Sequence, residues 1–270
     1  MIEIFQYDFI IYSLLTGILS GISCALLSNL IVLKKMEFIG DGAAHASFGG
    51  IAFAILMGWN LNIVGIITAS IFASIIYLIS KKQKIHENSI IGMLLSLSMA
   101  LGVIFLYIKP GYTPEISSYL FGDILMVNKQ DVILLSTILI IIIFSIILFN
   151  KEIKYFTFNQ RMAKIYGVPV SIINFIFLLT VSIVVVTSVK IVGIILVTSL
   201  LITPGVISKM WAKTLNQMFI ISSFIGFFSS SLGIIISYYL NIPSGPSIVV
   251  TLFTMFIFSY ILNYSKKLFS

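Results

Sequence analysis

Long uncharged apolar stretches, separated by short polar segments, run along nearly the whole chain. Each is close to the length of about 20 residues that an α-helix needs to cross a bilayer. One further stretch, 38–58, is apolar and rich in small residues but contains a charged residue. The pattern therefore predicts an all-α, polytopic membrane protein with about nine transmembrane helices. The other eight windows are 9–33, 61–79, 89–108, 132–149, 168–189, 191–208, 214–240 and 247–265.

Two breaks shape this count. Residues 214–265 carry no charge and are too long for one helix, and the turn signal from Asn241 to Pro246 divides them. Pro204 and Gly205 are expected to break or kink the window 191–208 near its inner end. If one segment is re-entrant instead of spanning, the alternative count is eight helices.

Composition supports a membrane protein and excludes other classes. The chain has 270 residues, of which 59% are hydrophobic and 9% charged, whereas about 25% of an ordinary soluble domain is charged. A soluble enzyme, a disordered chain and a disulfide scaffold are therefore excluded. The single cysteine, Cys24, lies in an apolar stretch and cannot form an intramolecular disulfide.

The net charge of +7 reflects orientation rather than binding to nucleic acid. With the N-terminus outside, the C-terminus cytoplasmic and nine alternating spans, only Lys109, Lys129 and Lys190 lie outside. Cytoplasmic loops of membrane proteins carry an excess of Lys and Arg, which favours this orientation. The thirteen cations expected inside are Lys34, Lys35, Lys81, Lys82, Lys84, Lys151, Lys154, Arg161, Lys164, Lys209, Lys213, Lys266 and Lys267.

Two loops are long enough to have a role of their own. The outer loop, 109–131, contains Glu115 and Asp123, which are candidates for lining an entrance. The inner loop, 150–168, has a helix-compatible centre that ends at Gly167, a residue type typical of helix C-termini. It is either a short surface helix that docks a cytosolic partner or a solvated linker.

Asp41 is the charged residue that does not lie in a loop. An ionised carboxylate inside a bilayer costs at least about 2.5–3.5 kcal/mol, so such residues face protein or water. His45 follows four residues later, on the same face of a helix, and both side chains are ligands for divalent first-row metals. His45 also lies ten residues beyond Lys35, which as a continuous helix rises about 15 Å and reaches mid-membrane.

The Asp41–His45 spacing alone is a weak metal motif. Asp41 could instead cap the following helix, and His45 could be a buried histidine bonded to a carbonyl. Two ligands are also too few for a specific metal site. If two copies met across a two-fold axis, two Asp and two His would converge and could hold Zn²⁺ or Mn²⁺.

Several ordered blocks resemble one protein family. They are FIGDGAAHASFGGIAFA at 38–54, SYLFGDIL at 118–125, IVGIILV at 191–197 with Pro204, and a last block that begins at Gly226 and ends with SYYLNIPSGPSIVV at 237–250. They are similar to the permease subunits of ABC transporters that move zinc, manganese or iron across the bacterial inner membrane. The family is related to the vitamin B12 and siderophore permeases.

The resemblance implies a single transmembrane permease domain over 1–270 with a cytoplasmic coupling segment at about 150–168. Asp41 and His45 match the family's metal ligands. The segment FNQRMAKIYG resembles the ATPase-coupling segment, and it contains Asn159, Gln160, Ala163 and Gly167. Ala163 and Gly167 fit that pattern, whereas Asn159 stands where the family usually has Asp.

The function expected is that of a multi-pass inner-membrane permease of an ATP-driven importer. Its partners would be a second permease protomer (homo- or heterodimer), cytosolic ATP-binding subunits, an extracytoplasmic metal-binding protein and the lipid bilayer. It would not be an enzyme, because it has no P-loop, and Zn²⁺, Mn²⁺ or Fe²⁺ would be cargo rather than a permanent cofactor. The alternatives are a proton-coupled metal transporter, an intramembrane acid–base enzyme, and a vitamin B12 or siderophore permease.

Overall fold

The computed structural model describes residues 8–83, 85–109, 127–158 and 160–268, and within these ranges the regular structure is entirely α-helical. The all-α prediction is confirmed. The helices are α1 (Asp8–Lys34), α2 (Ile39–Met57), α3 (Leu61–Gln83), α4 (Glu87–Ile108), α6 (Lys129–Leu148), α7 (Asn150–Phe158), α8 (Gln160–Ile165), α9 (Val170–Val192), α10 (Ile194–Leu200), α11 (Thr203–Trp211), α12 (Leu215–Leu240) and α13 (Ser244–Leu268).

In the described part of the chain, nine segments are long and apolar enough to cross a membrane, as the hydropathy pattern predicts. The span Ile194–Trp211 consists of α10 and α11, so the window with the proline crosses as one broken unit. Several helices, such as α1, α3 and α6, start or end a few residues beyond the predicted windows because charged residues continue them. Lys129 opens α6, for example, where Asn128 and Asp131 form a capping box.

The predicted break in this span is present at Leu201 and Ile202, between α10 and α11. Pro204 stands in the first turn of α11, where a missing N–H costs nothing. Gly205 lets α11 approach α1 closely, since a Cβ there would lie 2.6 Å from the carbonyl oxygen of Ser28. The break thus places a helix start against the middle of the bundle.

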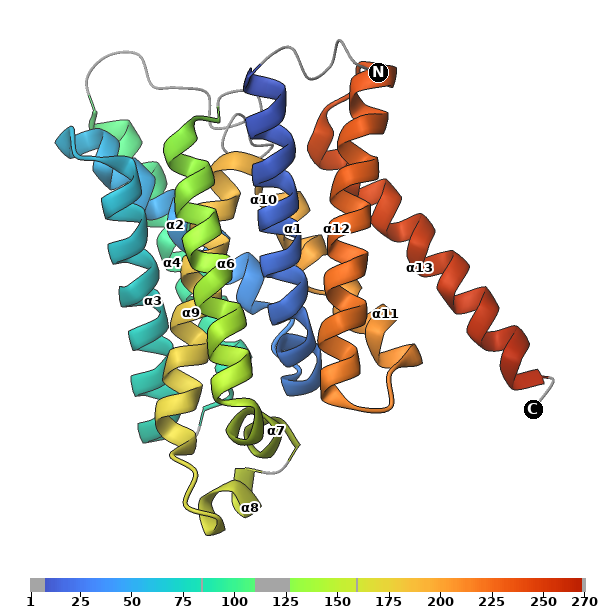
Figure 1. The fold of residues 1–270 in the computed structure, drawn as a ribbon. Coiled ribbons are helices and arrows are strands. Elements are labelled where there is room, and N and C mark those ends of the chain that lie inside the picture. The colour runs from blue at the N-terminus through green and yellow to red at the C-terminus, as the bar shows by residue number, and fades with distance from the viewer. Residues whose placement is uncertain (1–7, 84, 110–126, 159, 269–270) are drawn as a thin grey trace.

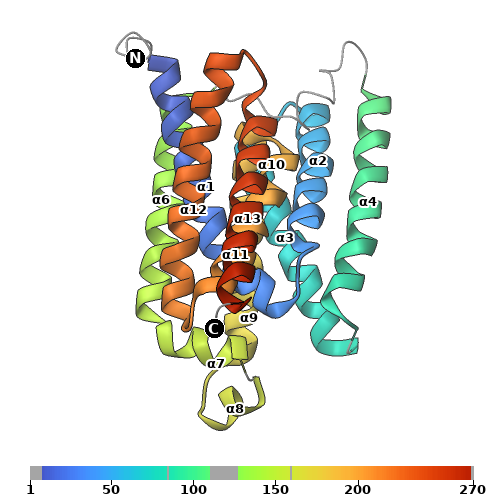
Figure 2. The ribbon, with the colours of Figure 1, turned by 90° about the vertical axis from the view of Figure 1, so that its right-hand side faces the viewer.

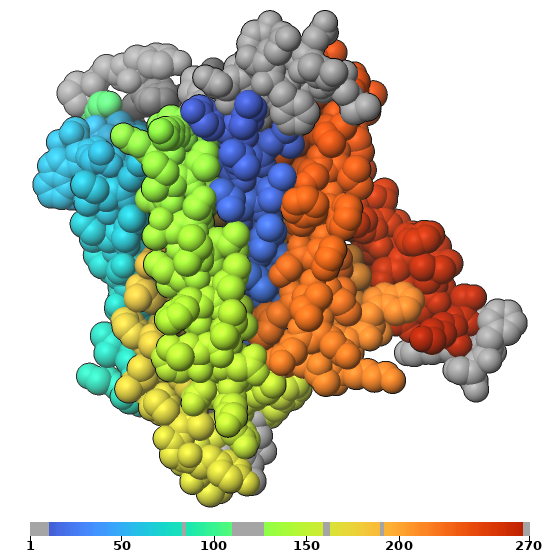
Figure 3. Space-filling model, in the orientation of Figure 1, coloured from blue at the N-terminus to red at the C-terminus, as the bar shows by residue number. Residues whose placement is uncertain are grey.

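Helix α1 is the central element of the bundle. It packs against α12, α11, α6 and α9, and in Figures 1 and 3 it lies between α6 and α12. Gly21 of α1 faces Gly226 of α12, and a Cβ on Gly226 would lie 2.5 Å from the carbonyl oxygen of Gly21. Small residues of this kind are what allow membrane helices to pack backbone to backbone. The outer helices α3, α4 and α6 expose much of their apolar surface.

The short helices α7 and α8 lie together at one end of the bundle (Figure 1). The inner loop is therefore helical. Gly167 has a φ of 74°, its N–H donates to the carbonyl of Lys164, and the N–H of Val168 donates to that of Ala163. This is the hydrogen-bond pattern of a Schellman motif, so the predicted role of Gly167 at a helix end is confirmed. The charged ends of α1, α3 and α13 lie toward this same end (Figure 1).

Candidate metal-transport site

Asp41 and His45 lie on α2, which begins at Ile39. Between Ile39 and Ala52 these two side chains are half-buried, whereas all the remaining residues of the segment are buried. The pair is one helical turn apart and close enough to interact electrostatically. The two predicted metal ligands therefore share the one face of this segment that the rest of the described chain leaves uncovered.

The flanking glycines show which helices border this face. A Cβ on Gly40 would contact Thr198 of α10 and Leu201 at its end, whereas one on Gly42 would contact Ile91 of α4 and Phe72 of α3. Successive residues of an α-helix differ by about 100°, so Asp41 points between these two directions. In Figure 2 the α2 ribbon lies between α10 and α4. The site is thus open between α10 and α4.

His45 has an unusual environment. Its Nδ1 atom is buried and has no hydrogen-bond partner among the described residues. A buried polar atom without a partner costs about 1–3 kcal/mol, and such atoms are rare enough to need an explanation. The alternative to a metal ligand was a buried histidine that is hydrogen-bonded to a carbonyl. The Nδ1 atom of His45 makes no such bond with the described residues.

The structure corrects two expectations about Asp41 and His45. Lys35 to Phe38 form a turn, so α2 starts at Ile39, and His45 lies six residues from that start, about 9 Å along the axis. The 15 Å rise, which assumed a continuous helix from Lys35, is wrong. The N-cap is Phe38, so Asp41 is not the cap but lies within the first turn, where a carboxylate complements the helix dipole.

The described part of one chain holds too few ligand side chains for a complete metal site. Within the described ranges no group of three or more His, Cys, Asp and Glu side chains could hold a metal ion. A specific site for Zn²⁺ or Mn²⁺ needs about four or more ligands. To hold a metal ion, Asp41 and His45 would therefore need further ligands from outside the described part of this chain.

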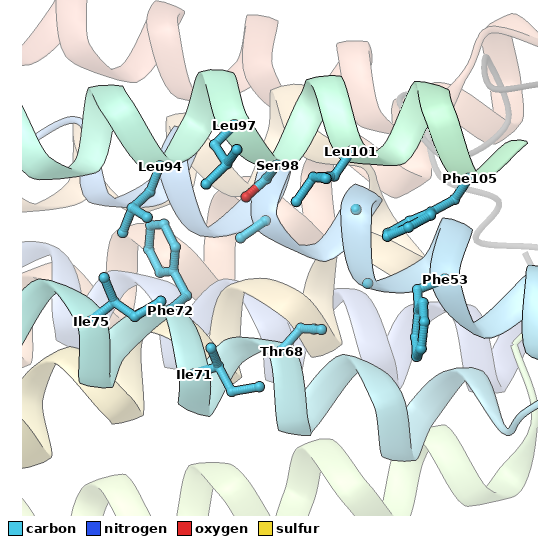
Figure 4. Close-up of a pocket in the computed structure, with 13 residues that line it drawn as sticks. Phe53, Thr68, Ile71, Phe72, Ile75, Leu94, Leu97, Ser98, Leu101 and Phe105 are labelled. Carbon is cyan, nitrogen blue, oxygen red and sulfur yellow. The ribbon is translucent and has the colours of Figure 1, made fainter. Parts of the chain in front are cut away.

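A cavity of about 280 Å³ lies between α2, α3 and α4 (Figure 4). Its lining is almost entirely hydrocarbon, including the rings of Phe53, Phe72 and Phe105. Thr68 of α3 and Ser98 of α4 contribute hydroxyls, and that of Thr68 already donates to carbonyls of its own helix. The cavity therefore has no set of metal ligands and is not a second metal site.

Three of the other predicted site residues are not placed by the structure. Glu115 and Asp123, the candidates for an entrance, lie outside the described residues. So does Asn159, which stands where the family usually has Asp. The roles predicted for these three residues stay predictions.

The structure places the rest of the predicted coupling segment, 150–168, apart from Asn159. Gln160 begins α8, and Ala163 of the same helix is fully buried. Ile153 and Phe156 of α7 are buried as well. Apolar side chains of both short helices therefore anchor the coupling segment to the bundle, which a solvated linker would not do.

Sequence reasoning missed a buried polar cluster at the centre of the bundle. Asn29 of α1 donates to the hydroxyl of Ser222 on α12 (2.7 Å), and its Oδ1 accepts from the hydroxyl of Ser208 on α11 (2.7 Å). All three residues are fully buried. The available signal was an asparagine inside an apolar span, since polar residues in such segments face the protein interior.

These observations define a polytopic membrane protein with a two-residue candidate site on α2. Comparison with known proteins identifies its family. The model of the ABC 3 transport family matches residues 6–263. The chain belongs to this family and is a metal-uptake permease of the ABC transporter class. The resemblance seen in the sequence is thereby confirmed, and the proton-coupled and vitamin B12 alternatives are disfavoured.

Known relatives and a solved structure are similar to this protein along most of its chain. It is 37% identical to a "Probable metal transport system membrane protein" of Thermotoga maritima, over 94% of this chain and 90% of the relative. It is 31% identical to the "Manganese transport system membrane protein MntC" of Halalkalibacterium halodurans, over 96% and 88%. Its fold matches PsaBC from Streptococcus pneumoniae with a TM-score of 0.82 and 30% identity, covering 94% and 92% of the two chains.

Proposed function

We propose that this chain is the permease of an ATP-driven manganese importer, in which Asp41 and His45 bind the ion transiently during alternating access. The observation that carries this proposal is the pairing of these two ligands on the only half-buried face of an otherwise buried helix segment, 39–52. Carboxylate oxygen and imidazole nitrogen suit Mn²⁺, Zn²⁺ and Fe²⁺ alike. Manganese is chosen because relatives such as that from Halalkalibacterium halodurans are named for manganese transport.

Two protomers would complete the ligand set. Each chain supplies one Asp and one His, and the face that bears them is open between α10 and α4. A two-fold axis beside this face would bring together two copies of each ligand, because symmetric dimers repeat the same surface on both subunits. The partner is a second copy of this chain or a related permease.

The other partners follow from the family and from the charge distribution. The chain has no P-loop, so separate ATP-binding subunits would hydrolyse ATP and dock on α7 and α8. That end of the bundle carries most of the cations, which favours an orientation with this end in the cytoplasm of a bacterial cell and the N-terminus outside. A metal-binding protein would deliver the ion to the opposite side, near Glu115 and Asp123.

The test is metal uptake into proteoliposomes that contain the permease with its ATP-binding partner. Asp41→Asn and His45→Gln keep the approximate side-chain size but replace the carboxylate and the imidazole by neutral amides, which are weaker metal ligands. Each is expected to lower Mn²⁺ uptake at least about tenfold, since even residues that only orient metal ligands contribute about 10–100-fold in affinity. Wild-type uptake by both variants would disprove the role of the pair.

The chain offers matched controls. Glu37 lies in the turn just before α2, and His86 is the other histidine and is exposed before α4. Glu37→Gln and His86→Gln are expected to transport normally. Uptake of Zn²⁺ or Fe²⁺ without Mn²⁺ would refute manganese as the cargo while leaving the site intact.

A further inference from the structure

Hydrogen bonds hold most of the backbone groups in the turn between α1 and α2. Lys35 adopts a left-handed conformation with φ 57°. Its N–H donates to the carbonyl of Val32 (3.4 Å), and the N–H of Met36 donates to that of Ile31 (3.0 Å), which closes the end of α1. The side-chain amide of Asn88 on α4 donates to the carbonyl of Lys35 (2.9 Å). A displacement of the end of α1 would therefore be passed on to α2.

Lys34, the last residue of α1, reaches the coupling segment. Its half-buried side chain places Nζ 3.8 Å from the centre of the Phe156 ring on α7. This is well within the range of about 6 Å for a cation–π contact, and such contacts strengthen when they are shielded from water. Phe156 is 1% exposed and packs in turn against Phe177 of α9, with ring centres 6.2 Å apart.

The same lysine also lies in the electrostatic field of a carboxylate that links α4 to α9. Glu87, the first residue of α4, interacts electrostatically with Lys34. The Glu87 carboxylate accepts a hydrogen bond of 2.8 Å from the side chain of Asn174 on α9. Lys34 thus contacts α7 directly and feels the charge of Glu87 on α4, which is itself bonded to α9, and it precedes Asp41 by only seven residues.

We propose that Lys34 is a positioning residue that couples α7 to the Asp41–His45 helix. When a partner subunit displaces α7, the contact between Phe156 and Lys34 would move the end of α1, and the held turn would carry that movement into α2. Helices α1 and α7 otherwise contact each other little, so this one contact has a large share in their connection. The inference rests on the proposed function, in which α7 and α8 receive the ATP-binding partner.

The experiment compares ATP hydrolysis with transport in the reconstituted complex. Lys34→Met keeps the length and apolar stem of the side chain but removes the cation, and Phe156→Leu removes the ring. Each is expected to leave basal ATPase activity within about twofold of wild type while the number of ions moved per ATP falls at least about fivefold. Their double variant should be no worse than either alone, since both remove the same contact.

Matched variants separate coupling from folding. Lys35→Gln removes the same charge one residue later, from an exposed side chain, and should leave the transport-to-ATP ratio unchanged. Lys34→Arg and Phe156→Tyr retain a cation and an aromatic face and should restore coupling. They also keep the test decisive if Lys34→Met fails to assemble.

The experiment distinguishes a failure of the proposed function from a failure of the role proposed for Lys34. If the wild-type complex moves no metal with any of Mn²⁺, Zn²⁺ or Fe²⁺, the proposed function is wrong. If the wild type is coupled and Lys34→Met retains the same transport-to-ATP ratio, or loses it only to the extent that Lys35→Gln does, the role of Lys34 is refuted and the proposed function is untouched.

Discussion

Replacing Asn29 by alanine tests whether the buried polar cluster holds the bundle together. The substitution removes two hydrogen bonds of 2.7 Å between helices, one to Ser222 on α12 and one from Ser208 on α11. Hydrogen bonds between membrane helices contribute on average about 0.6 kcal/mol each and at most about 1.7. Asn29→Ala should therefore lower the free energy of unfolding by about 1–3 kcal/mol.

The magnitude is kept modest by what remains after the substitution. The hydroxyl of Ser208 also donates to the carbonyl of Gly205, and that of Ser222 to the carbonyl of Phe219. Both serines thus retain a partner within their own helices. The loss in free energy of unfolding should therefore come mainly from the two hydrogen bonds by which Asn29 links α1 to α11 and α12.

The assay is reversible denaturant unfolding of the purified permease in mixed micelles. A double-mutant cycle with Ser222→Ala should give a coupling energy of about 0.6–1.7 kcal/mol between the two positions. Ser223→Ala is the matched control, because that hydroxyl bonds to the carbonyl of Phe219 in its own helix. A coupling energy below about 0.3 kcal/mol, which is within the error of additivity, would refute the reasoning.

Two further substitutions probe close packing and backbone strain. Gly226→Ala would place a Cβ 2.5 Å from the carbonyl oxygen of Gly21 and 2.7 Å from the Cβ of Ala25, so separating α1 from α12 should cost about 1–3 kcal/mol in the same unfolding assay. Gly92→Ala, whose Cβ meets nothing within 4 Å, is its control, and equal losses at both sites would contradict this. Lys35 has a φ of 57°, so Lys35→Gly should be more stable than Lys35→Ala by about 1 kcal/mol. Equal stability of the two variants would show that the turn is not strained.

Much of the architecture could be predicted from local features of the chain. Hydropathy, together with the turn signal at 241–246, located the nine spans found in the described part of the chain, because a helix in a bilayer must be apolar over most of its length. Pro204 correctly marked the break between α10 and α11, and Gly167 the end of α8, since both residue types act on their own backbone. Where a local argument was extended too far, as in the continuous helix assumed from Lys35, it placed His45 wrongly.

By itself the sequence determined the class of protein, the helix order and the Asp41–His45 pair, because apolar length and the helical repeat depend only on neighbouring residues. Only the tertiary structure decided which helices surround that pair and how it is linked to the coupling segment. Lys34 contacts Phe156 on a helix far along the chain, and Asn29 meets Ser222 across 193 residues. Such contacts depend on how closely small residues let the helices approach, which no local pattern encodes.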